Sequence, residues 1–361
     1  MSEIRLAAER KYAAELAALA AHDTAPRPPG WALSPKAVET YVIGSAKPVG
    51  GVAISAKYVG DPSLVQVAIA TLASDRALML VGEPGTAKSW LSEHLAAAVS
   101  GTSRLVIQGT AGTSEEHLKY GWNYALLLAE GPSSKALVPS PIYRAMRDGK
   151  FARFEEVTRT VPEVQDALIS ILSEKQIAVP ELGEIVTAER GFNIIATANT
   201  RDRGVNEMSA ALKRRFNFVQ VPVVDDLEQE IRIVTQREEE LRGDYQVGVA
   251  PPAEIARTLV TLFQELRAGM TKDGKTKLRV PASVLSTAEA ISVLFQSGIL
   301  AQHFGRGAVT GTDLGRALLG AVAKEGEEDH KAIREYCETV AKARKGAWKE
   351  LHEVVRRAGR G

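Results

Sequence analysis

The fold of this chain is set by residues 77–99, which read ALMLVGEPGTAKSWLSEHLAAAV. Five apolar residues typical of a buried strand lead into a turn that contains Gly and Pro, and residues that favour a helix follow. Gly82 and Gly85 let the backbone of the turn wrap its N–H groups around phosphate oxygens, and the positive end of the following helix points at the same place. A strand, a glycine-rich turn and a helix in this order predict a phosphate-binding loop.

The predicted loop carries a lysine and a hydroxyl with separate roles. Lys88 would reach the β- and γ-phosphates of a nucleotide, and the Ser89 hydroxyl would ligate Mg²⁺. The pattern G-x-x-x-x-G-K-[ST] has Gly where this chain has Ala87, although Ala is small enough to keep close backbone approach possible. The alternative is a fortuitous turn between a strand and a helix. The candidate nucleotide-binding residues are Gly82, Glu83, Pro84, Gly85, Thr86, Ala87, Lys88, Ser89 and Trp90.

Length and composition restrict the class of protein. A length of 361 residues predicts roughly two domains, and 45% hydrophobic with 25% charged residues is typical of a globular chain. The formal net charge of +1 gives no overall electrostatic case for binding nucleic acid or a membrane. The single cysteine, Cys337, excludes an internal disulfide and fits a reducing compartment. Charged residues at the start of the chain and the lack of an apolar run of about 20 residues predict a cytoplasmic protein.

The hydrophobic pattern divides the chain into four predicted parts. Residues 1–30 are expected to form an N-terminal helix and a linker, 31–224 an α/β nucleotide-binding domain, 225–323 an all-α domain, and 324–361 a helical extension. The candidate strands are Ala77–Val81, Arg104–Gln108, Phe151–Phe154, Asn193–Ala198 and Asn217–Val221. The candidate helices of the C-terminal part are 226–242, 252–268, 282–296, 312–323 and 327–357, the last being one long or broken helix.

A second motif, FARFEEVTRTVPEVQDALISILSEKQ, begins at Phe151. An enzyme that hydrolyses ATP needs one acidic group that holds Mg²⁺ through water and another that orients or deprotonates the attacking water, both at the end of a central strand. Glu155 is expected to serve the metal and Glu156 to act as the catalytic base. Arg153 interrupts the apolar strand before them. The alternative is an exposed pair of glutamates at the start of a helix.

These motifs resemble those of the MoxR branch of AAA+ ATPases, and the resemblance extends from Tyr58 to about residue 323. It implies an α/β P-loop AAA+ core with a parallel five-stranded sheet, followed by an all-α lid domain. The sequence YVGD at Tyr58–Asp61 resembles the nucleotide-edge motif of this family, so Val59 and Gly60 are candidates for adenine contact. The first acid in the family is usually Asp, where this chain has Glu155.

The resemblance also implies roles for residues that follow the later strands. Asn199, which ends FNIIATAN, matches the sensor 1 position that holds the attacking water and the γ-phosphate. Arg215, directly before Phe216, matches the arginine finger that points into a neighbouring subunit; Arg214 could act instead. Sensor 2 is the weakest match, because its expected arginine position holds Ala288 or Ala282; Arg279, the nearest candidate, could equally be an ordinary surface residue.

Two insertions and the C-terminal segment complete the pattern. Residues 119–140 are expected to form two short strands around a Gly-Pro-Ser-Ser turn, and 175–187 a second hairpin. The resemblance implies that both face a pore or a client, although Trp122, Tyr124 and Leu126 could instead share the core side of a strand. Residues 342–361 hold seven Lys or Arg against two Glu, which favours an amphipathic helix with a solvated basic face over a nucleic-acid patch.

The function implied is Mg²⁺-dependent hydrolysis of ATP by a homo-oligomer, expected as a hexameric ring, that remodels or activates a client protein. Family members commonly act with a von Willebrand factor A-type partner, so the resemblance implies such a partner here. The alternatives are a nucleotide-dependent scaffold with slow hydrolysis, motivated by Ala87, Glu155 and the missing sensor 2 arginine, and a nucleic-acid motor. Neither membrane insertion nor nucleic acid is expected.

Overall fold

The computed structural model describes residues 5–199, 206–281, 283, 285–322 and 327–358. The chain divides into two compact units: residues 1–83 with 87–222, and residues 84–86 with 223–361. The finer four-part division expected from the sequence stays a prediction. Across the described residues, no helix combines the length and the apolar character needed to cross a membrane.

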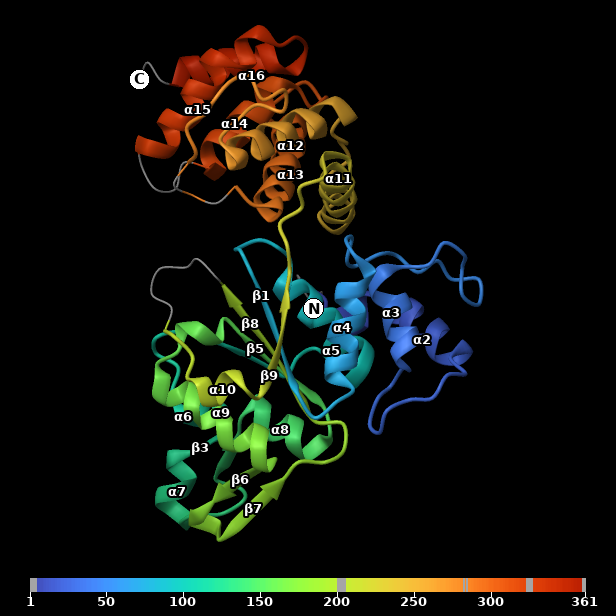
Figure 1. Cartoon of the computed structure of the whole chain (residues 1–361), viewed down its shortest axis with the longest axis vertical. Helices are drawn as coiled ribbons and strands as arrows, with labels where there is room; N and C mark the ends of the chain where they lie inside the picture. The colour runs from blue at the N-terminus through green and yellow to red at the C-terminus, as the bar shows by residue number, and fades with distance from the viewer. Residues whose placement is uncertain (1–4, 200–205, 282, 284, 323–326, 359–361) are drawn as a thin grey trace. The chain divides into compact units, whose positions relative to one another are not determined.

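The first unit is built on a parallel five-stranded sheet with strand order β2-β5-β8-β1-β9 (Figure 1). The strands are β1 (Ala77–Gly82), β2 (Val106–Gln108), β5 (Phe151–Glu155), β8 (Asn193–Asn199) and β9 (Phe216–Gln220). All five apolar runs proposed as strands are therefore confirmed, with ends that differ by one or two residues. The apolar residues exclude water on both faces, as expected for a parallel sheet covered by helices.

Alternate residues of each strand face opposite layers of helices. Leu78 and Leu80 belong to one core with α3 (Pro35–Ile43), α4 (Pro62–Leu72) and α5 (Lys88–Ser100). Met79 belongs to the other core, with α8 (Pro141–Asp148) and α9 (Pro162–Glu174). Figure 1 shows these two layers on either side of the sheet. On β5 the same alternation places Phe151 on the α5 side and Phe154 on the α8 and α9 side.

The remaining helical segments of this unit are short. The predicted N-terminal helix is present but divided at Tyr12 into α1 (Ala8–Lys11) and α2 (Ala13–His22). Tyr12 and Leu19 pack into the core with α3 to α5, so this helical pair is part of the unit. The other short elements are α6 (Glu115–Leu118), η1 (Val157–Arg159) and α10 (Ala210–Lys213).

One insertion matches its prediction and the other requires a correction. Residues 175–187 contain the expected hairpin, β6 (Gln176–Val179) and β7 (Glu184–Thr187), around η2 (Pro180–Leu182). Within 119–140 the strands β3 (Tyr120–Trp122) and β4 (Leu137–Pro139) do pair, but α7 (Tyr124–Glu130) lies between them. Tyr124 and Leu126 are therefore helical and do not alternate with Trp122 along a strand, because Asn123 caps a helix of strong helix formers.

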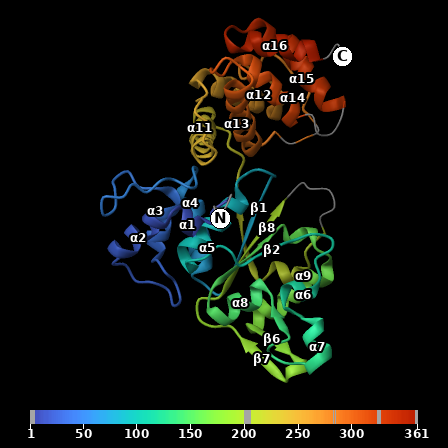
Figure 2. The ribbon, with the colours of Figure 1, turned by 180° about the vertical axis from the view of Figure 1, so that it is seen from behind.

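The two insertions are joined by a hydrogen bond. The hydroxyl of Tyr120 donates to Glu181 at 2.9 Å, and Figure 2 shows α7 beside the β6–β7 hairpin. Trp122 packs against the sheet core, whereas Tyr124 is 63% exposed. Of the two aromatic residues whose core position the sequence left open, Trp122 therefore contacts the core and Tyr124 faces solvent.

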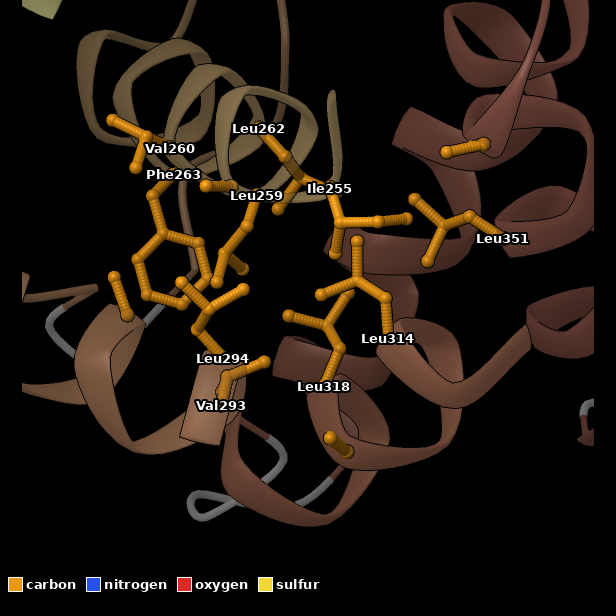
Figure 3. Packing of buried hydrophobic residues seen from close by; sticks show 14 of the residues in the cluster. Ile255, Leu259, Val260, Leu262, Phe263, Val293, Leu294, Leu314, Leu318 and Leu351 are labelled. Carbon is orange, nitrogen blue, oxygen red and sulfur yellow. The ribbon is translucent and has the colours of Figure 1, made fainter. Parts of the chain in front are cut away.

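In its described residues the second unit is built from helices joined by loops, as predicted, with an isolated antiparallel bridge between Met270 and Lys277. Its helices are α11 (Leu227–Asp244), α12 (Ala253–Ala268), α13 (Thr287–His303), α14 (Gly311–Val322), α15 (Glu327–Thr339), η3 (Ala341–Ala343) and α16 (Ala347–Ala358). The predicted helix over 327–357 is thus broken around η3. Figure 3 shows Leu259 and Phe263 of α12 meeting Leu294 of α13, with Leu314 of α14 and Leu351 of α16 in the same core.

The basic C-terminal segment is part of this unit. Leu351 and Val355 of α16 are buried, as the amphipathic-helix interpretation requires. Arg344 pairs with buried Glu265 at 2.7 Å and lies over the ring of Trp348, so one of the basic residues has a structural role. Arg360 of the same segment lies outside the described residues.

Candidate functional site

The predicted phosphate-binding loop connects the end of β1 to the start of α5. Gly85 has φ +75°, and Ala87 has φ +67° and ψ +22°. Both residues are in left-handed conformations, which glycine adopts without steric cost. This explains why the usual pattern has Gly at position 87, and Ala87 costs roughly 1–3 kcal/mol in backbone strain there. The loop therefore keeps its bend despite the substitution.

Lys88 begins α5 and is 6% exposed. Its Nζ donates to the carbonyl oxygens of Gly82 at 3.2 Å and Glu83 at 2.6 Å. The ammonium group is thus held against the same loop whose amides would hold phosphate. This position agrees with the phosphate-binding role predicted for it, and the role itself stays a prediction.

Glu155, at the end of β5, is 4% exposed and accepts four hydrogen bonds. Its Oε2 accepts from Ser89 Oγ at 2.6 Å and from Thr197 Oγ1 at 2.8 Å. Its Oε1 accepts from Ser92 Oγ at 2.6 Å and from Arg153 Nη2 at 2.7 Å. The structure thus brings Ser89 and Glu155, the two predicted metal-binding residues, into direct contact.

The environment of Glu155 keeps its carboxylate ionised. Burial raises the pKa of Glu155. The Arg153 guanidinium and the hydroxyls of Ser89, Ser92 and Thr197 lower that pKa by more than burial raises it, so the pKa of Glu155 lies below its ordinary value. Hard oxygen donors from a hydroxyl and an ionised carboxylate are the ligands that Mg²⁺ prefers. The residues present therefore fit a magnesium ion.

Glu156, the predicted catalytic base, follows in an unusual backbone conformation. It has φ +54° and ψ +46°, a left-handed conformation that costs a non-glycine residue roughly 1–3 kcal/mol and is concentrated at functional sites. Its amide donates to Thr197 Oγ1 at 2.9 Å, and its carboxylate pairs with Arg159 at 2.9 Å. Gly109 packs closely here, because a Cβ at that position would lie 2.4 Å from the Glu156 carbonyl oxygen.

Asn199, the predicted sensor 1 residue, ends β8 directly beside the loop. In the parallel register of β1 and β8, Asn199 is opposite Gly82, the first residue of the loop. The carboxyl ends of neighbouring parallel strands meet at one edge of the sheet, which is where ligands bind in open α/β folds. Lys88, Glu155, Glu156 and Asn199 are thus gathered at one edge.

Arg214 and Arg215 lie at the opposite end of the sheet. Arg215 directly precedes β9, whose first residue pairs with Ala77 at the start of β1. The six residues of β1 separate that end from the loop by roughly 16 Å at about 3.3 Å per residue. Arg215 donates to Ser173 Oγ at 2.9 Å and to the Ala211 carbonyl at 2.8 Å. The structure therefore does not bring either arginine to the loop of its own chain.

The candidate adenine contacts adjoin the first turn of α5. Trp90 donates from Nε1 to the Lys57 carbonyl at 2.8 Å, which ties α5 to the segment that contains Val59 and Gly60. Lys57 is in turn paired with Glu15 of α2. The N-terminal helix thereby anchors the edge of the predicted nucleotide site.

The sensor 2 candidates belong to the second unit. Arg279 forms an ion pair with Glu328 of α15 at 3.3 Å and is half exposed, which agrees with its interpretation as a surface residue. Ala288 lies in the first turn of α13, and Ala282 lies outside the described residues. Neither alternative position supplies an arginine.

Sequence reasoning missed three residues that complete the site. Ser92 and Thr197 hold the Glu155 carboxylate, and Gly109 makes room for the backbone of Glu156. For Ser92 and Thr197 the sequence does carry a signal, because each is a polar residue at a position where helix or strand periodicity predicts burial. Thr197 in NIIATAN is one such position, since it is 1% exposed.

Comparison with known proteins agrees with this architecture. Residues 77–216 match the family model described as AAA domain (dynein-related subfamily), and residues 228–358 match the YehL-like AAA+ ATPase C-terminal domain. The uncharacterized protein YehL of Escherichia coli (strain K12) is 47% identical over 350 residues, which cover 96% of this chain and 95% of YehL. An uncharacterized protein of Staphylococcus haemolyticus is 28% identical over 217 residues, covering 60% of this chain and 77% of that protein.

Solved structures share the fold at low sequence identity. NtrX from Brucella abortus in complex with ATP has a TM-score of 0.50 and 15% identity, covering 82% of this chain and 62% of the NtrX chain. NtrX in complex with ADP has a TM-score of 0.52 and 14% identity, covering 84% and 64%. This chain thus spans less than two thirds of the NtrX chains that it matches. At this identity the likeness concerns the fold alone.

Proposed function

We propose that this chain, which belongs to the YehL-like AAA+ ATPases, hydrolyses ATP at the carboxyl edge of its sheet with the help of Mg²⁺. The observation that carries the proposal is the 2.6 Å hydrogen bond between Ser89 Oγ and Glu155 Oε2, which places two hard oxygen ligands side by side next to Lys88. Mg²⁺ held there would neutralise charge that develops on the transferred phosphoryl group.

Each residue of the site has a defined task in this reaction. The loop amides and Lys88 hold the phosphates, while Ser89 would bind the metal directly and Glu155 through water. Glu156 accepts the proton of the attacking water, and Asn199 orients that water from the neighbouring strand. The left-handed backbone of Glu156 supports this assignment, because strained conformations of this kind are concentrated at functional sites.

Assembly would bring Arg215 of one subunit to the nucleotide of another. Arg215 lies roughly 16 Å from the loop along the sheet, by about 3.3 Å per residue, so it would act on the nucleotide of a neighbouring subunit. We infer a homo-oligomeric ring of the MoxR kind, expected to be hexameric, that remodels a client protein together with a von Willebrand factor A-type partner. Arg214 is the alternative finger.

A nucleotide-dependent scaffold with slow hydrolysis is the second candidate. Two observations favour it: the metal-binding acid is Glu155 paired with a buried arginine, and Ala87 takes a strained conformation in the loop. The steady-state rate of phosphate release separates the two functions. Sustained turnover of about one per second or faster, which is typical of enzymes, supports the enzyme, and release of one phosphate per bound nucleotide with little further turnover supports the scaffold.

The proposed site is tested by nucleotide titration and turnover of matched variants. Lys88→Ala is expected to lose tight binding of a fluorescent ATP analogue, whereas Lys47→Ala, an exposed loop lysine, leaves binding unchanged. Glu156→Gln is expected to keep binding and lose turnover, whereas Glu163→Gln, an exposed glutamate at the start of α9, keeps both. Unchanged nucleotide affinity in Lys88→Ala would contradict the assignment of the loop.

Assembly is tested by mixing two inactive variants. Arg215→Ala is expected to bind ATP normally and hydrolyse it poorly, because charge is removed only from the transition state. Mixing it with Lys88→Ala subunits should restore part of the activity, since an intact Lys88 site can then meet an intact Arg215. An inactive mixture despite proven subunit exchange would refute action across subunits.

A further inference from the structure

Arg153 is a buried charge in the middle of β5, the strand that ends at Glu155. Its side chain is 9% exposed, and each of its guanidinium nitrogens has a partner. Nε donates to Ser92 Oγ at 3.0 Å, and Nη1 to the Ser103 carbonyl at 3.1 Å. Nη2 donates to the Ser89 carbonyl at 3.0 Å and to Glu155 Oε1 at 2.7 Å.

Strand geometry explains why these groups meet. Successive side chains of β5 alternate between faces, so Phe151, Arg153 and Glu155 all face α5. Ser89 and Ser92 are three residues apart on α5 and therefore share one face of that helix. Burying Arg153 costs free energy that only a well-bonded partner offsets, so the arginine and Glu155 depend on each other.

The two oxygens of Glu155 have different neighbours. Oε1 is held by Arg153 and Ser92, and both of these side chains also lie within hydrogen-bond distance of the backbone carbonyl of Ser89. Oε2 is the oxygen that contacts Ser89, the predicted metal ligand. A glutamate is one methylene longer than the aspartate usual at this position and has one more rotatable bond to restrain. Arg153 supplies that restraint.

We infer that Arg153 is a positioning residue that sets the carboxylate of Glu155 for the metal ion bound beside Ser89. The inference rests on the proposed function, since it concerns the same site. The planar guanidinium bonds the carboxylate and the Ser89 carbonyl with one nitrogen while two others bind Ser92 and Ser103. A lysine keeps the charge but cannot reproduce this fork.

The test measures Mg²⁺ affinity in binding, without turnover. A fluorescent ATP analogue is titrated onto wild type, Arg153→Lys and Ser92→Ala, first in EDTA and then with increasing Mg²⁺. Loss of a group that orients a metal-binding side chain typically weakens the metal about 10- to 100-fold, so the Mg²⁺ midpoint of Arg153→Lys is expected to rise about tenfold. Ser92→Ala, which leaves the arginine in place, is expected to raise it about threefold. Nucleotide affinity in EDTA should stay within about twofold of wild type.

Ser100→Ala is the matched control, because Ser100 is buried on the same helix and bonds the Phe151 amide, away from Glu155. It should leave the Mg²⁺ midpoint unchanged. Ser92→Ala also keeps the inference testable if Arg153→Lys fails to fold, since Ala is a better helix former than Ser.

Three outcomes would overturn the positioning role. The first is an unchanged Mg²⁺ midpoint in both Arg153→Lys and Ser92→Ala. The second is a lower Mg²⁺ midpoint, which would make Arg153 a competitor of the metal. The third is a loss of nucleotide affinity in EDTA as large as the loss in Mg²⁺, which would indicate general loosening of α5. Failure of the proposed function has a different signature, namely unchanged nucleotide binding in Lys88→Ala.

Discussion

Thr197 is the residue through which the two acids of the site are connected, and replacing it by valine removes both connections. Its hydroxyl donates to Glu155 Oε2 at 2.8 Å and accepts from the Glu156 amide at 2.9 Å. Valine has nearly the same shape, so Thr197→Val deletes two hydrogen bonds without opening a cavity. The fold and the core around β8 should survive.

The two lost bonds set the size of the effect. A hydrogen bond to a charged group contributes about 1.5–3 kcal/mol, and an amide left without its partner costs about 1–3 kcal/mol. Part of this loss of stability is offset, by up to about 1 kcal/mol, because valine favours a buried strand. We therefore expect the free energy of unfolding of the first unit to fall by about 3 kcal/mol, a large share of the roughly 5–15 kcal/mol typical of a protein. Thr197→Ser keeps the hydroxyl and loses one methyl group, which should cost about 1 kcal/mol.

Urea unfolding followed by tryptophan fluorescence measures the difference. Trp31, Trp90 and Trp122 lie in the first unit and Trp348 in the second, so all variants are made in a Trp348→Phe background that reports on the first unit alone. With a slope of about 2 kcal/mol per molar urea, a loss of 3 kcal/mol moves the midpoint by about 1.5 M.

The comparison of valine with serine decides whether the hydroxyl is responsible. If Thr197→Val and Thr197→Ser lose the same free energy, or if both stay within about 0.5 kcal/mol of wild type, the connection between the acids contributes little and this reasoning is refuted. A changed urea slope would show that two-state comparison fails, and the variants would then be compared by hydrogen exchange of the Glu156 amide, which must exchange faster in valine.

Three further predictions concern the loop and the helical unit. Ala87→Gly relieves the left-handed strain at φ +67° but adds chain entropy to the unfolded state. Thermal unfolding should therefore show a free energy of unfolding that is higher by about 0.5–1 kcal/mol, and a lower value would contradict the strain. Burial raises the pKa of the Cys337 thiol to about 12, so at pH 8 the native protein should resist a thiol reagent that labels the unfolded chain at once; rapid native labelling would disprove this burial. Arg344→Met should destabilise the helical unit by about 3 kcal/mol because buried Glu265 loses its charged partner, whereas the surface control Arg257→Met should cost under about 1 kcal/mol, as Trp348 fluorescence would report.

Most of the architecture could be read from local patterns. Each of the five strands is a short apolar run, and each has its own signal in a few consecutive residues. The insertion over 119–140 is where this reading was wrong, because Asn123 and the helix formers after it favour α7 over a continuing strand. Alternation of Trp122, Tyr124 and Leu126 was compatible with either structure, and a short segment offers too little periodicity to choose between them.

The candidate site divides in the same way. The loop from Gly82 to Ser89 is one continuous segment, so residue order alone predicted its glycines, lysine and hydroxyl. Glu155 and Glu156 were predicted from their place at the end of a strand. The chain alone could not say that Arg153, an interruption in the apolar pattern of its strand, is bonded to Glu155 and to the first turn of α5. That arrangement depends on the parallel pairing of β5 with β8 and on which face of α5 covers them, and these are contacts between segments more than 40 residues apart. Local order encodes which groups a segment carries, whereas packing of distant segments determines which charges are buried together, because a charge leaves water only where another segment supplies its partners.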